Sequence, residues 1–170
     1  MAKINKQGII RYSEYIDECA IAIGYLRTAK NISTRHNTEY DRGLKNLELD
    51  VLGAKCELIF ADFLTRNNIN YKRAELAATT PQCTYDFKVN DIRIDVKGIS
   101  KDCCNVNQRT HTKKSVDRYV FILPTGNFTA RYWIFNSSEI DKWDLIETKA
   151  PFYSKKINTS STLDINENNI

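Results

Sequence analysis

Three residues near the middle of the chain, Asp86, Asp95 and Lys97, have the types and spacing of a metal-assisted catalytic site. If the segments that carry them pair as a hairpin, the two aspartates lie opposite each other with their Cβ atoms roughly 5 Å apart. Like charges at that distance repel, so a divalent cation is a natural partner, and carboxylate oxygens suit Mg²⁺ or Mn²⁺. Lys97 follows Asp95 by two residues and so points to the same face. The alternative is a solvated hairpin face with mixed charges.

The hairpin is predicted by two short segments of alternating apolar residues, 84–89 and 92–97, that flank Asn90-Asp91. Asn and Asp are typical of two-residue turns because they accept positive φ angles. The pairs expected on the apolar face are Val89 with Ile92, Phe87 with Ile94, and Tyr85 with Val96. The pairs expected on the other face are Lys88 with Arg93, Asp86 with Asp95, and Thr84 with Lys97. A slip by one residue would break every apolar pair, so the pattern favours this register.

A third carboxylate, Glu57, lies in a long helix predicted at residues 41–66. The apolar stripe of that helix is expected to contain Leu44, Leu47, Val51, Ala54, Leu58 and Ala61. Glu57 has mostly apolar or small neighbours, among which an unpaired acid is costly to bury. Gly53 costs about 1 kcal/mol relative to alanine inside a helix, which indicates close packing against another backbone. The alternative for Glu57 is an exposed position beside a nearby lysine.

Together these residues resemble the motif of the PD-(D/E)xK nuclease superfamily, whose fold is that of the restriction endonucleases. The matching residues are Gly53 and Glu57 on the helix, Asp86 on the first hairpin strand, and Asp95-Val96-Lys97 on the second. The resemblance covers residues 44–135. Tyr85 stands where the family name places a proline, and Gln108 occupies the place of a glutamine that some branches carry in the next helix.

The resemblance implies an α/β fold with a restriction endonuclease-like core, in which helices flank a mixed central β-sheet in the order αβββαβ. It implies a divalent-metal-dependent nuclease that hydrolyses phosphodiester bonds, with DNA favoured over RNA as the partner. The implied catalytic residues are Glu57, Asp86, Asp95 and Lys97, and the implied ligands of Mg²⁺ or Mn²⁺ are Asp86, Asp95, Glu57 and the carbonyl of Val96. Lys97 would orient or deprotonate the attacking water. Such nucleases commonly dimerise, so a homodimer is a further expectation.

Two other functions remain open at this point. One is a nucleic-acid-binding protein of the same fold without catalysis. Members of that kind have usually lost the lysine or an acid, whereas all four positions are filled here. The other is a structural or interaction domain in which the charged hairpin is a coincidence.

A basic segment that follows the motif predicts contacts with phosphate groups. The candidate nucleic-acid-binding residues are Lys101, Gln108, Arg109, Lys113, Lys114 and Arg118, with His111 among them. Contacts of this kind make affinity depend on salt. A solvated basic loop is the alternative. Tyr132, Trp133 and Trp143 are candidates for stacking on bases, although core packing is the favoured role for these aromatic side chains.

The other predicted elements complete one domain, residues 1–157, with a helix at 11–30 added to a core at 41–157. Asn67-Asn68 is expected to end the long helix, and the polar segment 31–37 to form a loop. Strands are predicted at 69–73, 119–123, 129–135 and 152–157, a loop at 74–82, a loop with a short helix at 98–115, and a turn at 125–127. A helix capped by Ser137 or Ser138 is expected to reach Glu147. The polar residues 158–170 are expected to form a flexible tail.

Composition fits an intracellular, cytoplasmic domain without a membrane partner. The chain has 170 residues and a net charge of +4, which is compatible with a nucleic-acid partner without requiring one. Its apolar stretches are too short to cross a bilayer, and its first residues lack the apolar run of a secretion signal. The five cysteines include no Cys-x-x-Cys spacing and are predicted to be free thiols. A zinc site built from Cys103, Cys104, His111 and His36 is an alternative whose spacing matches no standard module.

Overall fold

The computed structural model describes residues 5–35, 45–74, 85–113 and 115–158, which form a mixed α/β fold around a six-stranded sheet. The strand order is β1-β7-β6-β4-β3-β2. The strands are β1 Gln7–Arg11, β2 Lys72–Arg73, β3 Phe87–Val89, β4 Ile92–Gly98, β6 Arg118–Gly126 and β7 Thr129–Asn136. β4 and β6 run parallel, and the other neighbours are antiparallel. The predicted mixed sheet is therefore confirmed.

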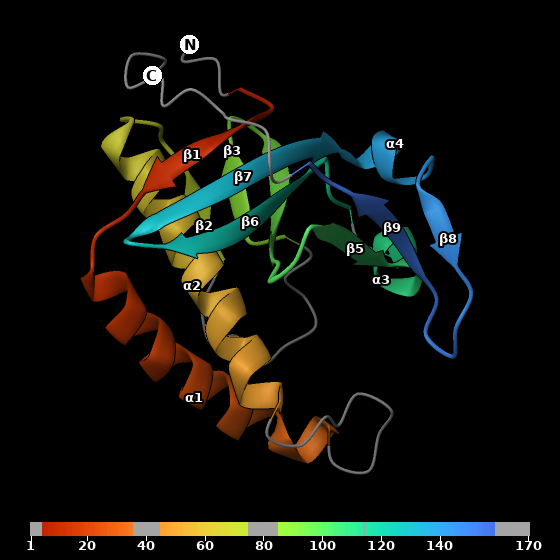
Figure 1. Cartoon of the computed structure of the whole chain (residues 1–170), viewed down its shortest axis with the longest axis horizontal. Helices are drawn as coiled ribbons and strands as arrows, with labels where there is room; N and C mark the ends of the chain where they lie inside the picture. The colour runs from red at the N-terminus through yellow and green to blue at the C-terminus, as the bar shows by residue number, and fades with distance from the viewer. Residues whose placement is uncertain (1–4, 36–44, 75–84, 114, 159–170) are drawn as a thin grey trace.

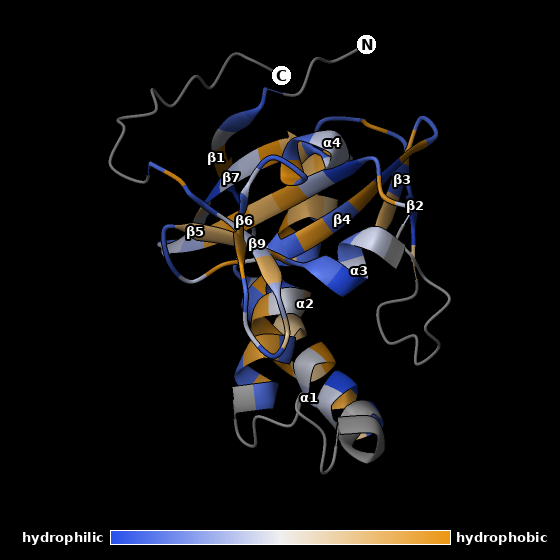
Figure 2. Ribbon diagram, turned by 90° about the vertical axis from the view of Figure 1, so that its right-hand side faces the viewer, coloured by the Kyte–Doolittle hydropathy of each residue, from blue (hydrophilic) through white to orange (hydrophobic). Residues whose placement is uncertain are grey.

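Two long helices, α1 Tyr15–Arg35 and α2 Lys45–Arg66, lie on one side of this sheet (Figure 1, Figure 2). The buried residues of α2 include Cys56, Ile59, Phe60 and Leu64, which belong to one core cluster with sheet residues such as Phe87, Ile94, Val120 and Ile122. The stripe predicted for this helix is confirmed in part, since Ala54 and Ala61 are buried whereas Leu47, Val51 and Leu58 are half-buried. Asn68 has a φ of 53°, which confirms that Asn67-Asn68 ends the helix.

The opposite face of the sheet is covered by a small second sheet of order β5-β9-β8 and by two short helices. These elements are β5 Cys103–Asn107, α3 Gln108–Lys113, α4 Ser137–Ile140, β8 Asp144–Ile146 and β9 Phe152–Lys156. Alternate residues of β6 point to this side, where Tyr119 and Phe121 are buried with Trp133, Ile140 and Trp143. The chain runs from β4 to its parallel neighbour β6 through β5 and α3, so this layer also supplies the crossover connection.

The predicted hairpin forms with the expected turn and register. Asn90 and Asp91 both have positive φ angles, 46° and 68°. The recorded pairs are Phe87 with Ile94, Lys88 with Arg93, and Val89 with Ile92. The ladder stops at Phe87, however, so the expected pairs of Tyr85 with Val96 and Asp86 with Asp95 do not belong to it. Thr84, which was expected opposite Lys97, lies outside the described residues.

The N-terminal prediction was partly wrong. α1 begins at Tyr15 rather than at Arg11, because residues 7–11 form strand β1 and pair with β7. Residues 31–35, expected in a loop, belong to α1. The pairing of β1 with β7 joins segments far apart in the chain, and local periodicity carries no information about such a partner.

At the C-terminal end, strands β6, β7 and β9 confirm the predictions, whereas the turn expected at 125–127 is shifted to Asn127-Phe128 because β6 continues to Gly126. The helix expected to reach Glu147 was wrong, since α4 ends at Ile140 and residues 144–146 form β8 against β9. Its cap is Asn136, with Glu139 as the reciprocal acid, rather than a serine. β5 was not predicted within the loop at 98–115. The tail from residue 159 and most of the loop at 74–82 lie outside the described residues.

Candidate active site

The centre of the candidate site is an ion pair on β4 between Asp95 and Lys97. Nζ of Lys97 lies 2.5 Å from Oδ2 of Asp95, and the Asp95 side chain is only 1% exposed. Burial alone would lower the pKa of Lys97, but the charges of Asp95 and Asp86 outweigh it and raise the pKa above its ordinary value. Lys97 is therefore an ammonium group at neutral pH.

Asp86 joins this pair from the end of the hairpin, where the regular ladder has stopped. Its backbone N–H donates to the carbonyl of Ile94 at 2.9 Å, and its carboxylate accepts a 2.7 Å hydrogen bond from the Val96 N–H. The Asp86 carboxylate thus accepts the hydrogen bond from the Val96 N–H that the backbone carbonyl of Tyr85 would accept if the ladder continued. This offset replaces the expected direct opposition of Asp86 and Asp95.

Burial, followed by the charges of Asp95 and Glu57, raises the pKa of Asp86 to about 7. Lys97 and the Val96 N–H act in the opposite direction but do not compensate fully. The structure therefore brings Asp86, Asp95 and Lys97 together, with two acids and one base in the group.

Glu57 approaches Asp86 from the α2 side and is held by two arginines. Its oxygens accept hydrogen bonds of 2.9 and 2.6 Å from Arg27 of α1, and Arg73 of β2 lies 3.7 Å away. The Glu57 side chain is 13% exposed, so it is neither an isolated buried acid nor an exposed partner of a lysine. Sequence reasoning missed Arg27 and Arg73, and no motif or spacing in the sequence pointed to either residue.

Two glycines explain how α1, α2 and β4 come close enough to assemble these groups. A Cβ on Gly24 would lie 2.3 Å from Cγ2 of Val51, so α1 and α2 touch there, one turn before Arg27. A Cβ on Gly98 would lie 2.8 Å from Cγ of Leu52, which lets α2 approach β4 directly after Lys97. The expected role of Gly53 was wrong, since its added Cβ would meet only the Arg27 guanidinium at 3.6 Å.

Oxygen donors for a divalent cation come from Asp86 and Asp95. Within the described parts of the chain, no group of three or more His, Cys, Asp or Glu side chains is arranged to hold a metal ion. Both oxygens of Glu57 accept hydrogen bonds from Arg27, so Glu57 is already engaged. The carboxylates that act on Lys97 are those of Asp95 and Asp86. Two hard carboxylates with a surplus of negative charge fit Mg²⁺ or Mn²⁺. The roles of Glu57 and the Val96 carbonyl as ligands stay predictions.

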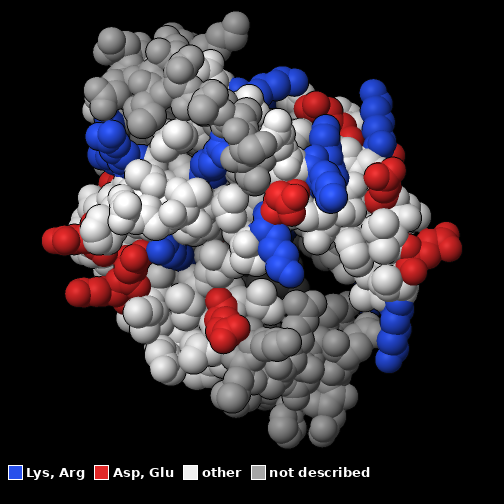
Figure 3. Space-filling view, viewed as in Figure 1, with Lys and Arg blue, Asp and Glu red and all other residues white. Residues whose placement is uncertain are grey.

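The predicted nucleic-acid-binding residues are spread over several environments. Lys101 and Arg109 are exposed, whereas Gln108 and Arg118 are half-buried. Lys114 and the side chain of Lys113 lie outside what the structure describes. On the face shown in Figure 3, the described Lys and Arg side chains are interspersed with Asp and Glu rather than gathered in one patch.

His111 is buried instead of lying on the basic surface. Its Nδ1 and Nε2 lie 3.0 Å from the Tyr119 hydroxyl and from a carboxylate oxygen of Asp141, respectively. The candidate stacking residues are also interior, with Tyr132, Trp133 and Trp143 all buried in the two core clusters, which confirms core packing.

The described cysteines Cys19, Cys56, Cys103 and Cys104 are free thiols, as predicted. Cys103, Cys104 and His111 form no metal-holding group, and His36 lies outside the described residues. No helix in the described ranges is both long and apolar enough to span a bilayer. Compared with known proteins, the chain matches no family model, and neither a curated protein nor a solved structure gives a significant match.

Proposed function

We propose that this chain is a divalent-metal-dependent nuclease that hydrolyses phosphodiester bonds, with DNA as the favoured substrate. The observation that carries the proposal is the meeting of Asp86 with the ion pair of Lys97 and the buried Asp95 at the open end of the β3–β4 hairpin. A buried ion pair is weak evidence for stability, because desolvation offsets much of its attraction. A second acid beside it adds to that cost, so a role in binding a cation is the simpler explanation.

The order of the elements supports a PD-(D/E)xK-type fold as part of this proposal. Along the chain, α2, β2, β3, β4, α3 and β6 follow the order αβββαβ, with β5 as an addition between β4 and α3. Glu57 lies on α2 and Asp95 and Lys97 on β4, which supports the resemblance, whereas Asp86 lies directly before β3 rather than on it. A reducing, intracellular setting is also proposed, and the free thiols support it.

In the proposed mechanism, Asp86 and Asp95 would hold Mg²⁺ or Mn²⁺. When bound, such an ion polarises the scissile phosphate and lowers the pKa of a bound water. Lys97 carries its proton at neutral pH, so its role is to orient the water and to stabilise the charge that develops on the phosphate, rather than to remove a proton. Glu57 positions Arg27 and Arg73 beside these groups.

A non-catalytic nucleic-acid-binding protein of the same fold is the second candidate. The observation that favours it is the Arg27–Glu57 pair, which occupies one of the three acids that the resemblance assigns to the metal. The two candidates share the fold and differ in whether Asp86 and Asp95 suffice for cleavage.

The deciding experiment is a cleavage assay with Mg²⁺ on supercoiled plasmid, single-stranded DNA and RNA. Wild type is compared with Asp95→Asn, and Asp117→Asn serves as the matched control because Asp117 pairs with Arg93 away from the site. We expect wild type to cleave DNA and Asp95→Asn to lose at least ~10²-fold in rate, since an electrostatic group at the reacting phosphate contributes about this much. Equal cleavage by wild type and Asp95→Asn, or none by wild type, would defeat the proposal.

A further inference from the structure

Two guanidinium groups converge on one carboxylate at the edge of the candidate site. Arg27 binds both oxygens of Glu57, while the nearest nitrogen of Arg73 stays 3.7 Å from Oε2, beyond hydrogen-bond distance. The negative charges of Glu57 and Asp86 both act to raise the pKa of the two arginines, against the effect of burial. Glu57 is therefore fully engaged by the first guanidinium and neutralises the second only in part.

Arg73 has donors that the described protein leaves without acceptors. Its Nε and one terminal nitrogen are buried, and neither makes a hydrogen bond. Its guanidinium carbon lies 5.3 Å from the centre of the Phe87 ring, and the side chain as a whole is still 20% exposed. A buried donor without an acceptor loses its hydration and gains nothing in return, so such a group in a stable fold calls for an explanation.

We propose that Arg73, together with Arg27, binds a backbone phosphate of the nucleic-acid strand next to the Asp86–Asp95 site. A guanidinium presents a planar fork of donors that matches two oxygens of one phosphate. The stacking of Arg73 on Phe87 fixes the plane of that fork, and the 20% exposure of the side chain leaves part of it within reach of a strand. The inference rests on the proposed function, because it is the neighbouring acid site that makes a nucleic-acid phosphate the expected anion.

The test measures binding separately from cleavage, in EDTA, by the fluorescence anisotropy of a short labelled single-stranded DNA and its duplex. Arg73→Gln is compared with wild type and with Arg66→Gln, a matched control in which the lost arginine pairs with Asp62 on the same helix. We expect Arg73→Gln to bind about 10-fold more weakly and its logarithmic salt slope to fall by about 1, as for the loss of one phosphate contact. Arg73→Lys should bind with intermediate affinity, since it keeps the charge and loses the fork.

Arg66→Gln should keep the wild-type salt slope, and circular dichroism should show that each variant is folded. Inorganic phosphate should compete with the labelled DNA only weakly. Tight binding of inorganic phosphate with no binding of DNA would overturn the assignment to a strand, and so would the absence of DNA binding by wild type.

The outcomes separate this inference from the proposed function. If Arg73→Gln binds DNA with the affinity and salt slope of wild type while Asp95→Asn still loses cleavage, the nuclease proposal stands and the phosphate site falls. If wild type cleaves nothing but binds DNA in an Arg73-dependent way, the phosphate site stands and the nuclease proposal falls.

Discussion

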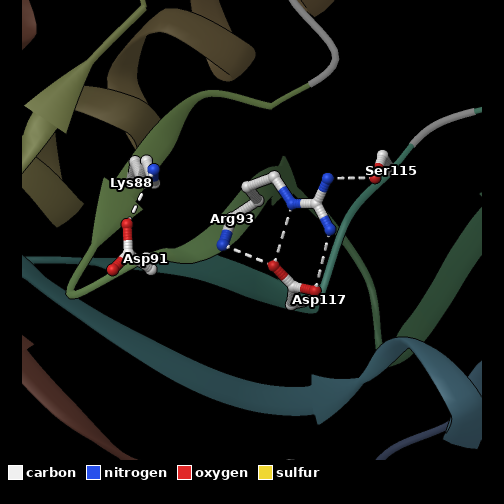
Figure 4. Close-up of polar contacts among 5 residues, drawn as sticks. All are labelled: Lys88, Asp91, Arg93, Ser115 and Asp117. Carbon is white, nitrogen blue, oxygen red and sulfur yellow. Dashed lines mark hydrogen bonds and ion pairs between the residues drawn. The ribbon is translucent and has the colours of Figure 1, made fainter.

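Strand β4 carries two charged clusters of opposite character. Near its start, Arg93 meets Asp117 through hydrogen bonds of 2.8 Å from its backbone N–H and of 3.0 and 3.2 Å from its guanidinium, and a further donor reaches Ser115 (Figure 4). Near its end, Asp95 is buried, and Lys97 and Asp86, both half-buried, lie beside it. The first cluster balances one charge against one; the second holds more acid than base.

The acids of the two clusters differ in exposure, since the Asp95 side chain is 1% exposed and that of Asp117 42%, whereas Lys97, at 31%, is nearly as exposed as Arg93. The side chains of Arg93 and Asp117 are 36% and 42% exposed, so they keep part of their hydration, and a pair of this kind contributes about 1 kcal/mol or less. It joins β4 to the beginning of β6, since the Asp117 N–H also donates to the carbonyl of Arg93. Burying the Asp95 carboxylate costs desolvation, which the ion pair with Lys97 offsets only in part. We infer that the Arg93–Asp117 cluster stabilises the fold, and that the cluster of Asp86, Asp95 and Lys97 serves the proposed chemistry.

The largest expected difference between the two clusters is in cleavage. Replacing Lys97 by Gln should reduce the rate of Mg²⁺-dependent DNA cleavage about 10²- to 10³-fold, because it removes the cation that stabilises charge on the phosphate. Replacing Arg93 by Gln removes an equally charged side chain from the same strand and should leave the rate within about twofold of wild type.

Single-turnover cleavage at saturating enzyme measures both rates, and the DNA affinity of each variant in EDTA shows whether it is folded. If Lys97→Gln and Arg93→Gln lose the same fraction of the cleavage rate, the two clusters do not differ in function and Lys97 is not a catalytic residue.

A smaller difference is expected in how stability depends on pH without metal. The pKa of Asp86 is raised to about 7, so the folded state holds this proton longer than the unfolded chain and stability falls as pH rises from about 4 to about 7. Asp86→Asn should lose this pH dependence. Its free energy of unfolding should therefore rise relative to that of wild type by at most ~4 kcal/mol between about pH 4 and about pH 7. The groups that set the slope are Asp95, Glu57 and Lys97.

Asp117 should show the opposite sign. The hydrogen bonds from Arg93 lower the pKa of Asp117, so its stabilising contribution is present at neutral pH and is lost as pH falls through the acid range. Urea unfolding of wild type, Asp86→Asn and Asp117→Asn across this range in EDTA measures both effects. If the free energies of unfolding of Asp86→Asn and wild type differ by the same amount at every pH, then the raised pKa of Asp86 is not the cause of the pH dependence.

The hairpin was predictable from sequence because its information is local. Asn90-Asp91 fixes the turn, and the alternation of Phe87, Val89, Ile92 and Ile94 fixes the register. The convergence of Asp86, Asp95 and Lys97 follows from that register. The detail of the contact does not follow from it. The ladder ends at Phe87, and the Asp86 carboxylate replaces a backbone partner of Val96, which depends on how the chain enters the strand.

The partners of Glu57 depended on contacts that no local pattern encodes. Arg27 reaches Glu57 only because Gly24 lets α1 touch α2 at Val51, and Arg73 comes from a two-residue strand. The same reason explains the missed strands β1, β5 and β8, each of which is short and is defined by its partner in another part of the chain. Tertiary pairing overrides propensity in segments of this length.

If Asp86 and Asp95 hold a divalent cation, direct titration with Mn²⁺ followed by electron paramagnetic resonance detects the binding without any substrate. We expect saturable Mn²⁺ binding by wild type and by Asp117→Asn, with binding lost in Asp95→Asn and weakened in Asp86→Asn. Mn²⁺ binding that is the same in wild type and Asp95→Asn, or no binding by folded wild type, would contradict this assignment.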